Sequence, residues 1–516
     1  MSAPSTTLAH PTLAKIVATI GPASDSPELV RKLIQAGVAV FRLNFSHGTL
    51  EDHARRVSTI RAAAKELGQP IAILGDLQGP KIRVGVLPAE GITLEAGQDV
   101  VFTPPGRESA CSAASKAACL PSGFDRLATD VHPGDRVLIN DGIIRLLAIE
   151  REPSDAPDVL RCRVKVGGLV TSKKGINLPD SDVQASAITE QDWRHVEWSV
   201  AHGLDFLALS FVRRAEEVRE LKRALANMCP IDHAHDAGGK GALIPIIAKI
   251  EKPQALDDLD GILEAADGIM VARGDLGVEM DLSEVPLVQK RLIAKADEHG
   301  KPCIVATQML ETMCSATTPT RAEVSDVANA ILDGADAVML SAETASGGFP
   351  LLVVETMRRV VAAAETRLVE TTVTPTPARK LVQSRYRTAA LAHGAWHVAH
   401  DAGAKIIACW SQEGGTARYL SQTGLVIPIV AYSSDERHVR RMALLRGVTA
   451  RHMHVPVSGT LGEWNMLVEE DLLILGWVRP GDPIVLLAGK PLGSKGATST
   501  IALHYTGNRT TGFMRV

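Results

Sequence analysis

The chain has 516 residues, of which 45% are hydrophobic and 22% charged, and its formal net charge is −4. This length predicts about three to four domains. The near-balanced charge argues against broad nucleic-acid binding, which requires a basic surface, and an aromatic content of 3% argues against a stacking platform for single strands.

The amino-terminal sequence MSAPSTTLAH lacks the basic and apolar stretches of a secretory signal peptide. No apolar run approaches the roughly 18 residues of a membrane-spanning helix. The seven cysteines include no C-x-x-C pair, which argues against a zinc site and is typical of reduced thiols. We therefore expect a cytoplasmic globular protein that has no nucleic-acid or membrane partner.

Eight short apolar runs that end in polar residues occur in the first 350 residues, and they begin at Lys15, Val38, Ile71, Phe206, Ile244, Gly268, Cys303 and Ala337. Continuous apolar runs predict strands that are buried on both faces. Amphipathic stretches such as SPELVRKLIQAG predict helices in most of the gaps. Eight alternating units favour a closed (β/α)8 barrel over a doubly wound open sheet, because nearly every strand ends in polar residues that a barrel gathers at one face.

The gap between the third and fourth runs is the longest, and it holds short β-like pieces such as DRVLIND and LRCRVKVGG. It predicts a small β-barrel domain inserted at the polar face as a lid. A Pro/Thr-rich linker and a second α/β pattern follow the last barrel strand. The expected division is a tail over 1–12, the barrel over 13–79 and 183–352, the lid over 80–182, a helix and linker over 353–380, and a carboxy-terminal α/β domain over 381–516.

The second and third strand ends carry groups suited to phosphate and a monovalent cation. Arg42, Asn44 and Ser46 alternate and therefore share one side of a strand, and a guanidinium beside neutral oxygens suits phosphate plus such a cation. His47 is also consistent with a simple loop hydrogen bond. The third strand end adds a second polar set, which is Asp76, Gln78, Lys81 and Arg83.

The fifth and sixth strand ends predict a metal site. Lys249 and Glu251 share one side of a strand, and Asp275 ends the neighbouring strand in the sequence VARGDLG. Two carboxylates with room for water suit Mg²⁺, although an internal Lys–Glu ion pair is the alternative. Thr307, Gln308, Ser341 and Glu343 complete the face. The set indicates phosphoryl transfer without a Walker A or a protein-kinase Gly-rich loop.

In the carboxy-terminal region, SQEGGTAR follows a predicted strand and opens a helix. Ser411, Gly414, Gly415 and Thr416 could bind an anion at the start of this helix, and an ordinary capped helix start is equally consistent. His452 and His454 are expected on the surface rather than in a metal site.

Seven segments resemble the sequence blocks of the pyruvate kinase family, in family order and over residues 13 to 516: RLNFSHG, GDLQGPKIR, SKKGINLPD, IPIIAKIEKPQ, MVARGDLGVE, ATQMLETM and LSAETASG. The resemblance implies transfer of the phosphoryl group of phosphoenolpyruvate to ADP, giving pyruvate and ATP, with Mg²⁺ or alternatively Mn²⁺. It also implies a homotetramer with a phosphorylated effector bound at the loop of Ser411, Gly414, Gly415 and Thr416.

The resemblance further implies residue roles. Glu251 and Asp275 would hold the metal, and the backbone N–H groups of Gly274 and Asp275 would hold the substrate carboxylate. Lys249 would neutralise the phosphoryl group in flight. Thr307, or a water chain through Ser341, would protonate the methylene carbon. The remaining roles are phosphate binding by Arg42 and nucleotide binding by His47, Arg83 and Lys174.

The third block departs from potassium-dependent members, which resemble DTKGPEIR where this chain reads DLQGPKIR. Lys81 stands where they carry Glu, and Leu77 stands where they carry Thr. Because a fixed ammonium can supply the charge of K⁺, we expect K⁺ not to be required, with Asn44, Ser46 and Asp76 as the remnant of its site.

Two rival functions remain open from the residues alone. A barrel lyase that binds pyruvate through a carboxylate-held Mg²⁺ would share the metal pair, but it would not need Lys249, Lys174 and Arg83 as phosphate ligands. A non-enzymatic sensor of sugar phosphates would predict a degraded metal or lysine position, and Lys249, Glu251 and Asp275 are all intact.

Overall fold

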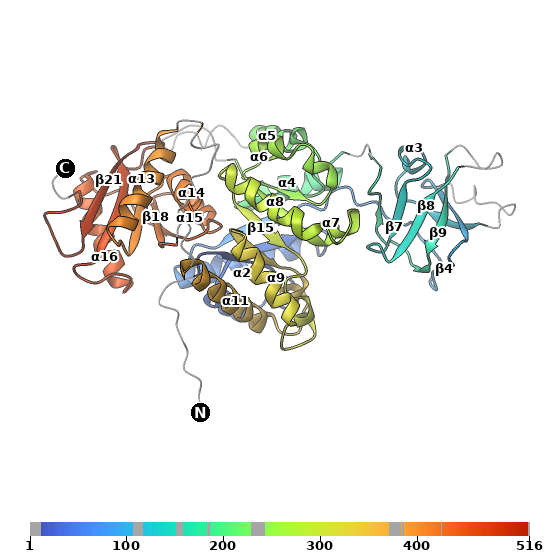
Figure 1. Cartoon of the computed structure of the whole chain (residues 1–516), viewed down its shortest axis with the longest axis horizontal. Coiled ribbons are helices and arrows are strands. Elements are labelled where there is room, and N and C mark those ends of the chain that lie inside the picture. Colours follow the sequence, from blue (N-terminus) through green and yellow to red (C-terminus); the bar gives the residue numbers. More distant parts are fainter. Residues whose placement is uncertain are drawn as a thin grey trace, which may run out of the picture.

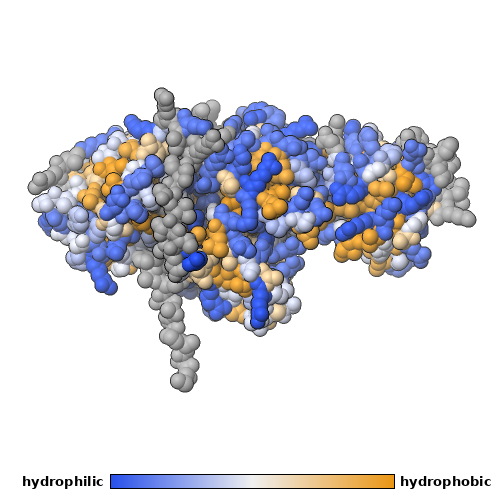
Figure 2. Space-filling model, in the orientation of Figure 1, coloured by the Kyte–Doolittle hydropathy of each residue, from blue (hydrophilic) through white to orange (hydrophobic). Residues whose placement is uncertain are grey.

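The computed structural model describes residues 12–106, 117–150, 158–181, 183, 186–228, 243–370, 383, 386–424 and 426–513. The carboxy-terminal domain, the barrel and the inserted β domain follow one another along the long axis (Figure 1). On the face drawn in Figure 2, apolar patches are interspersed among hydrophilic residues in all three parts. None of the described helices is long and apolar enough to cross a membrane. Residues 1–11 of the expected tail and 371–380 of the expected helix and linker lie outside the described residues.

The central part is a closed barrel of eight parallel strands, which confirms the predicted fold class. Each of the eight apolar runs forms one strand. Around the barrel their order is β1 (Lys15–Thr19), β16 (Ala337–Leu340), β15 (Cys303–Ala306), β14 (Gly268–Ala272), β13 (Ile246–Ile250), β12 (Phe206–Leu209), β3 (Ala72–Asp76) and β2 (Val38–Asn44).

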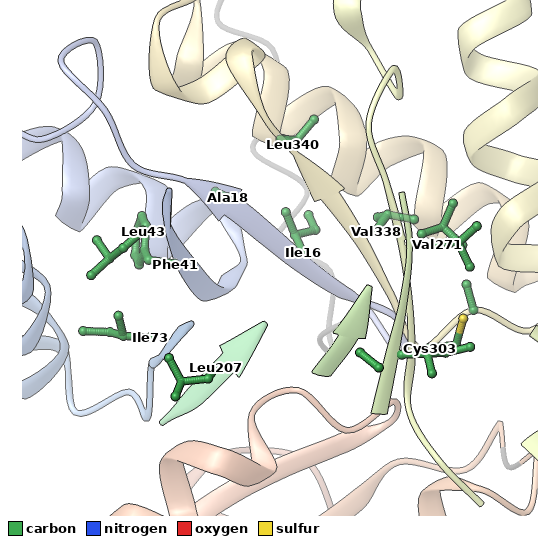
Figure 3. Close-up of a cluster of buried hydrophobic side chains, with 14 of the residues drawn as sticks. Ile16, Ala18, Phe41, Leu43, Ile73, Leu207, Val271, Cys303, Val338 and Leu340 are labelled. Carbon is green, nitrogen blue, oxygen red and sulfur yellow. The ribbon is translucent and has the colours of Figure 1, made fainter. Parts of the chain in front are cut away.

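Both faces of these strands are buried, because side chains alternate along a strand. Val17 and Met270 belong to the cluster inside the barrel, whereas Ile16 and Val271 belong to the cluster between the strands and the surrounding helices (Figure 3). Continuous apolar runs are thus required on every barrel strand.

The helices outside the barrel begin at residues that favour a helix start. Thr49, Thr189 and Thr320 each form a reciprocal capping box with an acidic residue three positions later. The helices are α1 (Pro27–Ala36), α2 (Leu50–Leu67), α4 (Glu190–Ala201), α5 (Ala215–Met228), η3 (Pro253–Leu256), α6 (Leu259–Ala265), α7 (Arg273–Glu279), α8 (Val285–Glu298), η4 (Glu311–Cys314), α9 (Arg321–Leu332), α10 (Ala342–Ala345) and α11 (Pro350–Glu370).

The inserted β domain lies between β3 and α4. Its strands are β4 (Ile92–Leu94), β5 (Asp99–Thr103), β6 (Ala118–Pro121), β7 (Arg136–Ile139), β8 (Ile144–Ala148), β9 (Leu160–Val166), β10 (Gly168–Val170) and β11 (Ile176–Asn177), with the short helix α3 (Leu127–Asp130). In the described residues they form a six-stranded sheet, β11-β7-β8-β9-β5-β6, and a separate pair, β10-β4. The expected small barrel is therefore two sheets here, since β4 and β10 pair with each other rather than joining the ends of the larger sheet.

The carboxy-terminal domain is a five-stranded sheet with helices on both faces. Its elements are α13 (Arg387–Asp401), β17 (Ile406–Trp410), α14 (Gly415–Ser421), β18 (Ile429–Ser433), α15 (Glu436–Met442), β19 (Val448–His452), α16 (Leu461–Ile474), β20 (Pro483–Gly489) and β21 (Thr498–Tyr505). The strand order is β19-β18-β17-β20-β21, with β21 antiparallel. Strand β19 and helix α16 were not predicted from the sequence.

This domain covers the amino-terminal end of the barrel. Lys15 Nζ, at the start of β1, donates to the carbonyl of Val448 at 2.7 Å. Asp336, just before β16, accepts from Gln422 Nε2 at 3.0 Å. Ala443 and Leu444 extend the hydrophobic cluster inside the barrel. The carboxyl ends of the strands, at the opposite face, are left for the site.

The described thiols differ from one another. Cys162, Cys303, Cys314 and Cys409 are free, whereas Cys119 is disulfide-bonded. The expectation of reduced thiols throughout is therefore wrong at Cys119.

Candidate active site

Lys249 lies at the centre of a buried polar cluster at the carboxyl end of the barrel. It occupies β13, and Glu251 follows that strand on the same side. The Nζ atom of Lys249 lies 2.8 Å from Glu251 Oε1 and 3.2 Å from Asp76 Oδ1. It also donates to Ser210 Oγ at 2.7 Å. The structure thus brings together the ends of β3, β12 and β13.

Arg42 completes this cluster from β2. Its Nε donates to Asp76 Oδ2 at 2.6 Å, and one terminal nitrogen donates to Thr19 Oγ1 at 3.0 Å. The Asp76 carboxylate, 1% exposed, therefore holds two cations in fixed places. Neither Thr19 nor Ser210 was singled out from the sequence.

The opposite charges in this cluster shift one another's pKa values in favour of the ionised forms. Burial would raise the pKa of Asp76, but the cations of Lys249 and Arg42 hold it below its usual value. Burial would lower the pKa of Lys249, but the carboxylates of Asp76 and Glu251 raise it above its usual value. Burial raises the pKa of Glu251, and Lys249 opposes that rise. Lys249 and Asp76 are consequently both ionised near neutral pH.

Glu251 is oriented by the backbone as well as by Lys249. Its Oε2 accepts from the N–H of Phe211 at 2.7 Å. Phe211 has a φ of 54°, a conformation that side chains larger than glycine rarely adopt. The turn after β12 therefore fixes the carboxylate of Glu251.

Thr307 and Gly274 are joined by a direct hydrogen bond between the ends of β15 and β14. The N–H of Gly274 donates to Thr307 Oγ1 at 2.8 Å, and this hydroxyl donates to the carbonyl of Ala306 at 2.6 Å. Thr307 and Gln308 have φ values of 67° and 55°. Consecutive left-handed residues are costly, and such strain is concentrated at functional sites.

Arg273 stabilises this strained turn by hydrogen bonds to its backbone. Its guanidinium donates to the carbonyls of Ala306 at 3.3 Å and Thr307 at 2.6 Å. It also pairs with Asp326 of α9. Arg273 is 8% exposed. The sequence places it at a strand end, but its role could not be assigned from spacing.

Asp275 and Lys81 face each other across the boundary between the barrel and the inserted domain. Lys81 Nζ lies 3.8 Å from Asp275 Oδ1. The ion pair of Lys81 in the described structure is thus with the expected metal ligand and not with Asp76 of the expected cation site. Leu77 is buried, and its N–H donates to the carbonyl of Ala208 at 3.0 Å.

Asn44, Ser46 and His47 form a turn after β2. Asn44 Oδ1 accepts from the N–H of Ser46 at 3.2 Å. Ser46 and His47 are exposed, and the carbonyl of His47 lies 3.0 Å from His53 Nε2. The side chain of His47 is therefore accessible to a ligand at the rim of the face.

Arg83 and Lys174 lie on the two chain segments that connect the barrel to the inserted domain. Arg83 forms an antiparallel bridge with Gly175, and its guanidinium donates to the carbonyl of Lys173 at 3.0 Å. The carbonyl of Lys174 accepts from the N–H of Val84 at 2.8 Å. The fold thus brings together the two backbone segments that carry these cations, although they are far apart in the sequence.

A buried contact anchors the inserted domain to α7. Glu279 Oε1 lies 2.6 Å from Lys252 Nζ and accepts from Asn177 Nδ2 at 2.8 Å. Glu279 is 1% exposed. Because α7 also carries Asp275, this contact links the position of β11 to that of the expected metal ligand. Spacing alone gave no signal for it.

Ser341 and Glu343 lie at the end of β16. Glu343 accepts from the N–H groups of Ser341 at 2.6 Å and Leu310 at 3.3 Å. The Oγ of Ser341 is buried and has no hydrogen-bond partner among the described residues. It can therefore bond to a water or ligand.

Glu251 and Asp275 fit a divalent metal. The described residues hold no group of three or more His, Cys, Asp or Glu side chains suited to a metal. A Mg²⁺ site needs only one or two carboxylates, however, when waters and substrate oxygens complete it. Each of these carboxylates already pairs with an ammonium, of Lys249 and Lys81 respectively, so a metal would bind here through exchange of these ion pairs.

A second candidate site lies in the carboxy-terminal domain, where a cavity of about 370 Å³ is lined by the loop from Ser411 to Thr416. Ser411 Oγ accepts from the N–H of Ala417 at 3.1 Å, and Thr416 Oγ1 lies 2.8 Å from Thr498 Oγ1. Gly414 has a φ of 81° and precedes Gly415, the first residue of α14. His452, on the edge strand β19, and His454 are both exposed, as expected from the sequence.

Comparison with known proteins gives consistent matches. The family models described as "Pyruvate kinase, barrel domain" and "Pyruvate kinase, alpha/beta domain" match residues 12–354 and 389–504. The pyruvate kinase of Mycobacterium intracellulare is 40% identical over 494 residues, which cover 96% of this chain and 98% of the relative. That of Corynebacterium glutamicum is 38% identical over 498 residues, with coverage of 96% and 98%. That of Geobacillus stearothermophilus is 39% identical over 496 residues, with coverage of 95% and 80%.

Proposed function

The chain belongs to the pyruvate kinase family, and from that premise we propose how its own residues transfer the phosphoryl group of phosphoenolpyruvate to ADP. The observation that carries the proposal is the buried Lys249 ammonium, held between Asp76, Glu251 and Ser210. A fixed cation in a water-poor site stabilises the charge that develops on a phosphoryl group in flight.

Arg42 and Lys249 bind the phosphoryl group from two sides. Asp76 holds both cations, so neither has to reorganise when the transition state forms. The Ser210 hydroxyl accepts from Lys249, and together with Asp76 and Glu251 it occupies the three donors of the ammonium. One of these partners is therefore exchanged for the phosphoryl group when the substrate binds.

Glu251 and Asp275 hold the divalent metal, Mg²⁺ or alternatively Mn²⁺. When bound, the ion neutralises charge on the phosphoryl and carboxylate oxygens of the substrate. The backbone N–H groups of Gly274 and Asp275 bind the carboxylate. Gly274 exchanges its hydrogen bond to Thr307 for one to the substrate, which frees the Thr307 hydroxyl.

Protonation of the methylene carbon completes the reaction. Thr307 is one donor, and its position at the strained turn supports that role. A water chain through Ser341 is the other, supported by the buried hydroxyl that has no partner among the described side chains.

The nucleotide binds between the barrel and the inserted domain. Arg83, Lys174 and the exposed His47 supply its contacts. The inserted domain, over residues 80–182, acts as a lid on the barrel, over 13–79 and 183–352. The two connecting segments that carry Arg83 and Lys174 give the lid its attachment.

Lys81 substitutes for a monovalent cation. Its ammonium lies beside Asp275 and supplies a positive charge near the phosphoryl groups. The remnant of a cation site, formed by Asn44, Ser46, Asp76 and Leu77, contains an apolar side chain where a ligand oxygen would be needed. We therefore propose that K⁺ is not required.

The enzyme is further proposed to be a cytoplasmic homotetramer. The carboxy-terminal domain over 381–516 follows a helix and linker over 353–380. In this domain, a phosphorylated effector is bound by Ser411, Gly414, Gly415 and Thr416. Sedimentation equilibrium tests the tetramer. Titration of the wild-type enzyme with fructose bisphosphate, a sugar monophosphate and AMP tests the effector.

The activity is tested by a coupled assay of pyruvate formation from phosphoenolpyruvate, ADP and Mg²⁺. We expect turnover by the wild-type protein and its loss in Lys249→Met. A folded wild-type protein that forms no pyruvate, with or without the three candidate effectors, would contradict the proposal.

A further inference from the structure

The wall of the carboxy-terminal cavity is shared between the two domains that meet there. Helix α15 contributes His438, Arg441 and Met442, and the barrel contributes residues that include Phe206 and Pro245. Phe206 is the first residue of β12. A barrel strand that ends at the active site therefore begins at this cavity.

Arg440 of α15 connects the helix to the barrel through one buried carboxylate. Its Nε donates to Asp205 Oδ1 at 2.8 Å. Asp205 is 1% exposed and directly precedes β12. Its other oxygen accepts from Arg61 at 2.7 Å and from the N–H of Ile73 at 2.8 Å.

Asp205 is also tied to β3 by its backbone. Its N–H donates to the carbonyl of Ile73 at 2.9 Å. One residue therefore fixes the starts of two adjacent strands, β3 and β12, which pair in parallel from Leu74 and Phe206 onward. Both strands are fully buried, and buried strands in a close-packed interior transmit displacement rather than absorb it.

The other ends of these two strands carry the groups that position the catalytic lysine and the metal ligand. Asp76, the last residue of β3, binds Lys249 and Arg42. Ser210 and Phe211 follow β12 and contact Lys249 and Glu251. Strands of four and five residues span about 13 to 17 Å, which is the distance the coupling must cover.

We propose that Asp205 is a positioning residue that couples α15, at the cavity wall, to Lys249 and Glu251 through β3 and β12. The effect of this coupling on catalysis rests on the proposed function. The contacts from Arg440 through Asp205 to β3 and β12 are a property of the fold alone. A ligand that shifts α15 changes the geometry of Lys249 without approaching it.

The test replaces Arg440 in the full-length protein. Arg440→Met removes the cation while Asp205 keeps Arg61 and Ile73, so the barrel retains most of its local contacts. Arg440→Lys keeps the charge but not the fork of donors. The matched control is Arg437→Met, because Arg437 lies on the same helix and pairs with Asp435 beside it.

Two readouts are needed. The first is kcat and KM for phosphoenolpyruvate and ADP. The second is backbone hydrogen–deuterium exchange over residues 72–79 and 206–211. We expect Arg440→Met to lower kcat by about tenfold, since small misplacements of reacting groups have large effects on rate. We also expect faster exchange in both segments and an unchanged KM for ADP. The kcat and exchange rates of Arg440→Lys should lie between those of the wild type and Arg440→Met. Those of Arg437→Met should match the wild type.

Wild-type kcat and exchange in a folded Arg440→Met protein would overturn the proposal. So would a lower melting temperature alone, because that result would make the pair merely structural. If Arg440→Met does not fold, Asp205→Asn and Arg440→Lys decide by the same two readouts. If the wild-type protein does not turn over phosphoenolpyruvate, the proposed function fails, and the exchange of the two segments still decides the coupling.

Discussion

Replacing Arg273 by methionine should slow turnover far more than it weakens substrate binding. The guanidinium holds the carbonyls of Ala306 and Thr307 and is the only charged group in contact with those carbonyls among the described residues. Thr307 and Gln308 both adopt left-handed conformations. Without Arg273, the turn that carries the Thr307 hydroxyl can relax toward ordinary backbone angles.

The magnitudes follow from the two opposing contributions. Two left-handed residues cost roughly 1–3 kcal/mol each. Two hydrogen bonds from a charged donor contribute roughly 1.5–3 kcal/mol each. These two contributions are of similar size. Loss of the hydrogen bonds therefore removes about as much stabilising free energy as the left-handed conformations cost. A loss of roughly 3–4 kcal/mol in the transition state lowers kcat by about 10² to 10³.

The assay measures kcat and KM for phosphoenolpyruvate, together with deuterium exchange into the methyl group of pyruvate by NMR. The exchange experiment isolates the proton step, so it should slow in parallel with kcat. Asp326→Asn is the matched control, because it removes the partly exposed partner of Arg273 and leaves both carbonyl contacts. We expect it to change kcat by less than about threefold. A folded Arg273→Met protein with kcat within threefold of the wild type would refute the reasoning.

The remaining predictions concern pH, monovalent cations and metal. Burial raises the pKa of Asp336 to about 7 from an ordinary value of 3.8. The folded state therefore binds more protons than the unfolded state between about pH 4 and 7. As a result, the free energy of unfolding should fall as pH rises through that window. Thermal melts from pH 5 to 8 should show this fall, and Asp336→Asn should flatten it; equal slopes would contradict the assignment. The wild-type enzyme should keep most of its activity in a tetramethylammonium buffer without K⁺, whereas Lys81→Glu should become K⁺-dependent; wild-type activity of a few per cent without K⁺ would disprove the substitution. Excess EDTA should abolish turnover but shift the melting temperature by less than about 2 °C, because Glu251 keeps its bonds to Lys249 and Phe211; full turnover in EDTA would exclude the metal role.

The barrel could be predicted from the sequence because its strands are buried on both faces. That burial requires uninterrupted apolar runs, and each of the eight runs formed a strand. Strand β19 was missed because it is an edge strand whose sequence, VTARH, alternates and ends in two polar residues. Helix α16 was missed because its sequence is apolar on more than one face, which weakens the helical period.

Part of the site was equally accessible to sequence reasoning. Alternation along a strand placed Lys249 and Glu251 on one side, and the closed barrel brought Arg42 and Asp76 to them. The backbone angles of Thr307 could not be anticipated, since they depend on Arg273 at the start of α7. The ion pair of Lys81 with Asp275 likewise depends on how the inserted domain meets the barrel.

Asp205 shows a different limit. An aspartate before a strand of an α/β barrel has no local feature that separates it from an ordinary loop residue. Its importance arises from three neighbours, Arg61, Ile73 and Arg440, of which one lies more than two hundred residues away in the sequence. Such a contact can be recognised only when the two domains are seen together.

The pairing of the first barrel strand with the last has a consequence for synthesis of the chain. Lys15 of β1 pairs in register with Ala337 of β16, which leaves the ribosome about 320 residues later. At typical elongation rates of 5–20 residues per second, β1 remains without that partner for roughly 15 to 65 s. The side chain of Lys15 remains without its partner for longer still, because the carbonyl of Val448 is synthesised later. Throughout that interval the nascent chain exposes an unpaired strand edge, so folding in the cell should depend on factors that shield such edges until the barrel closes.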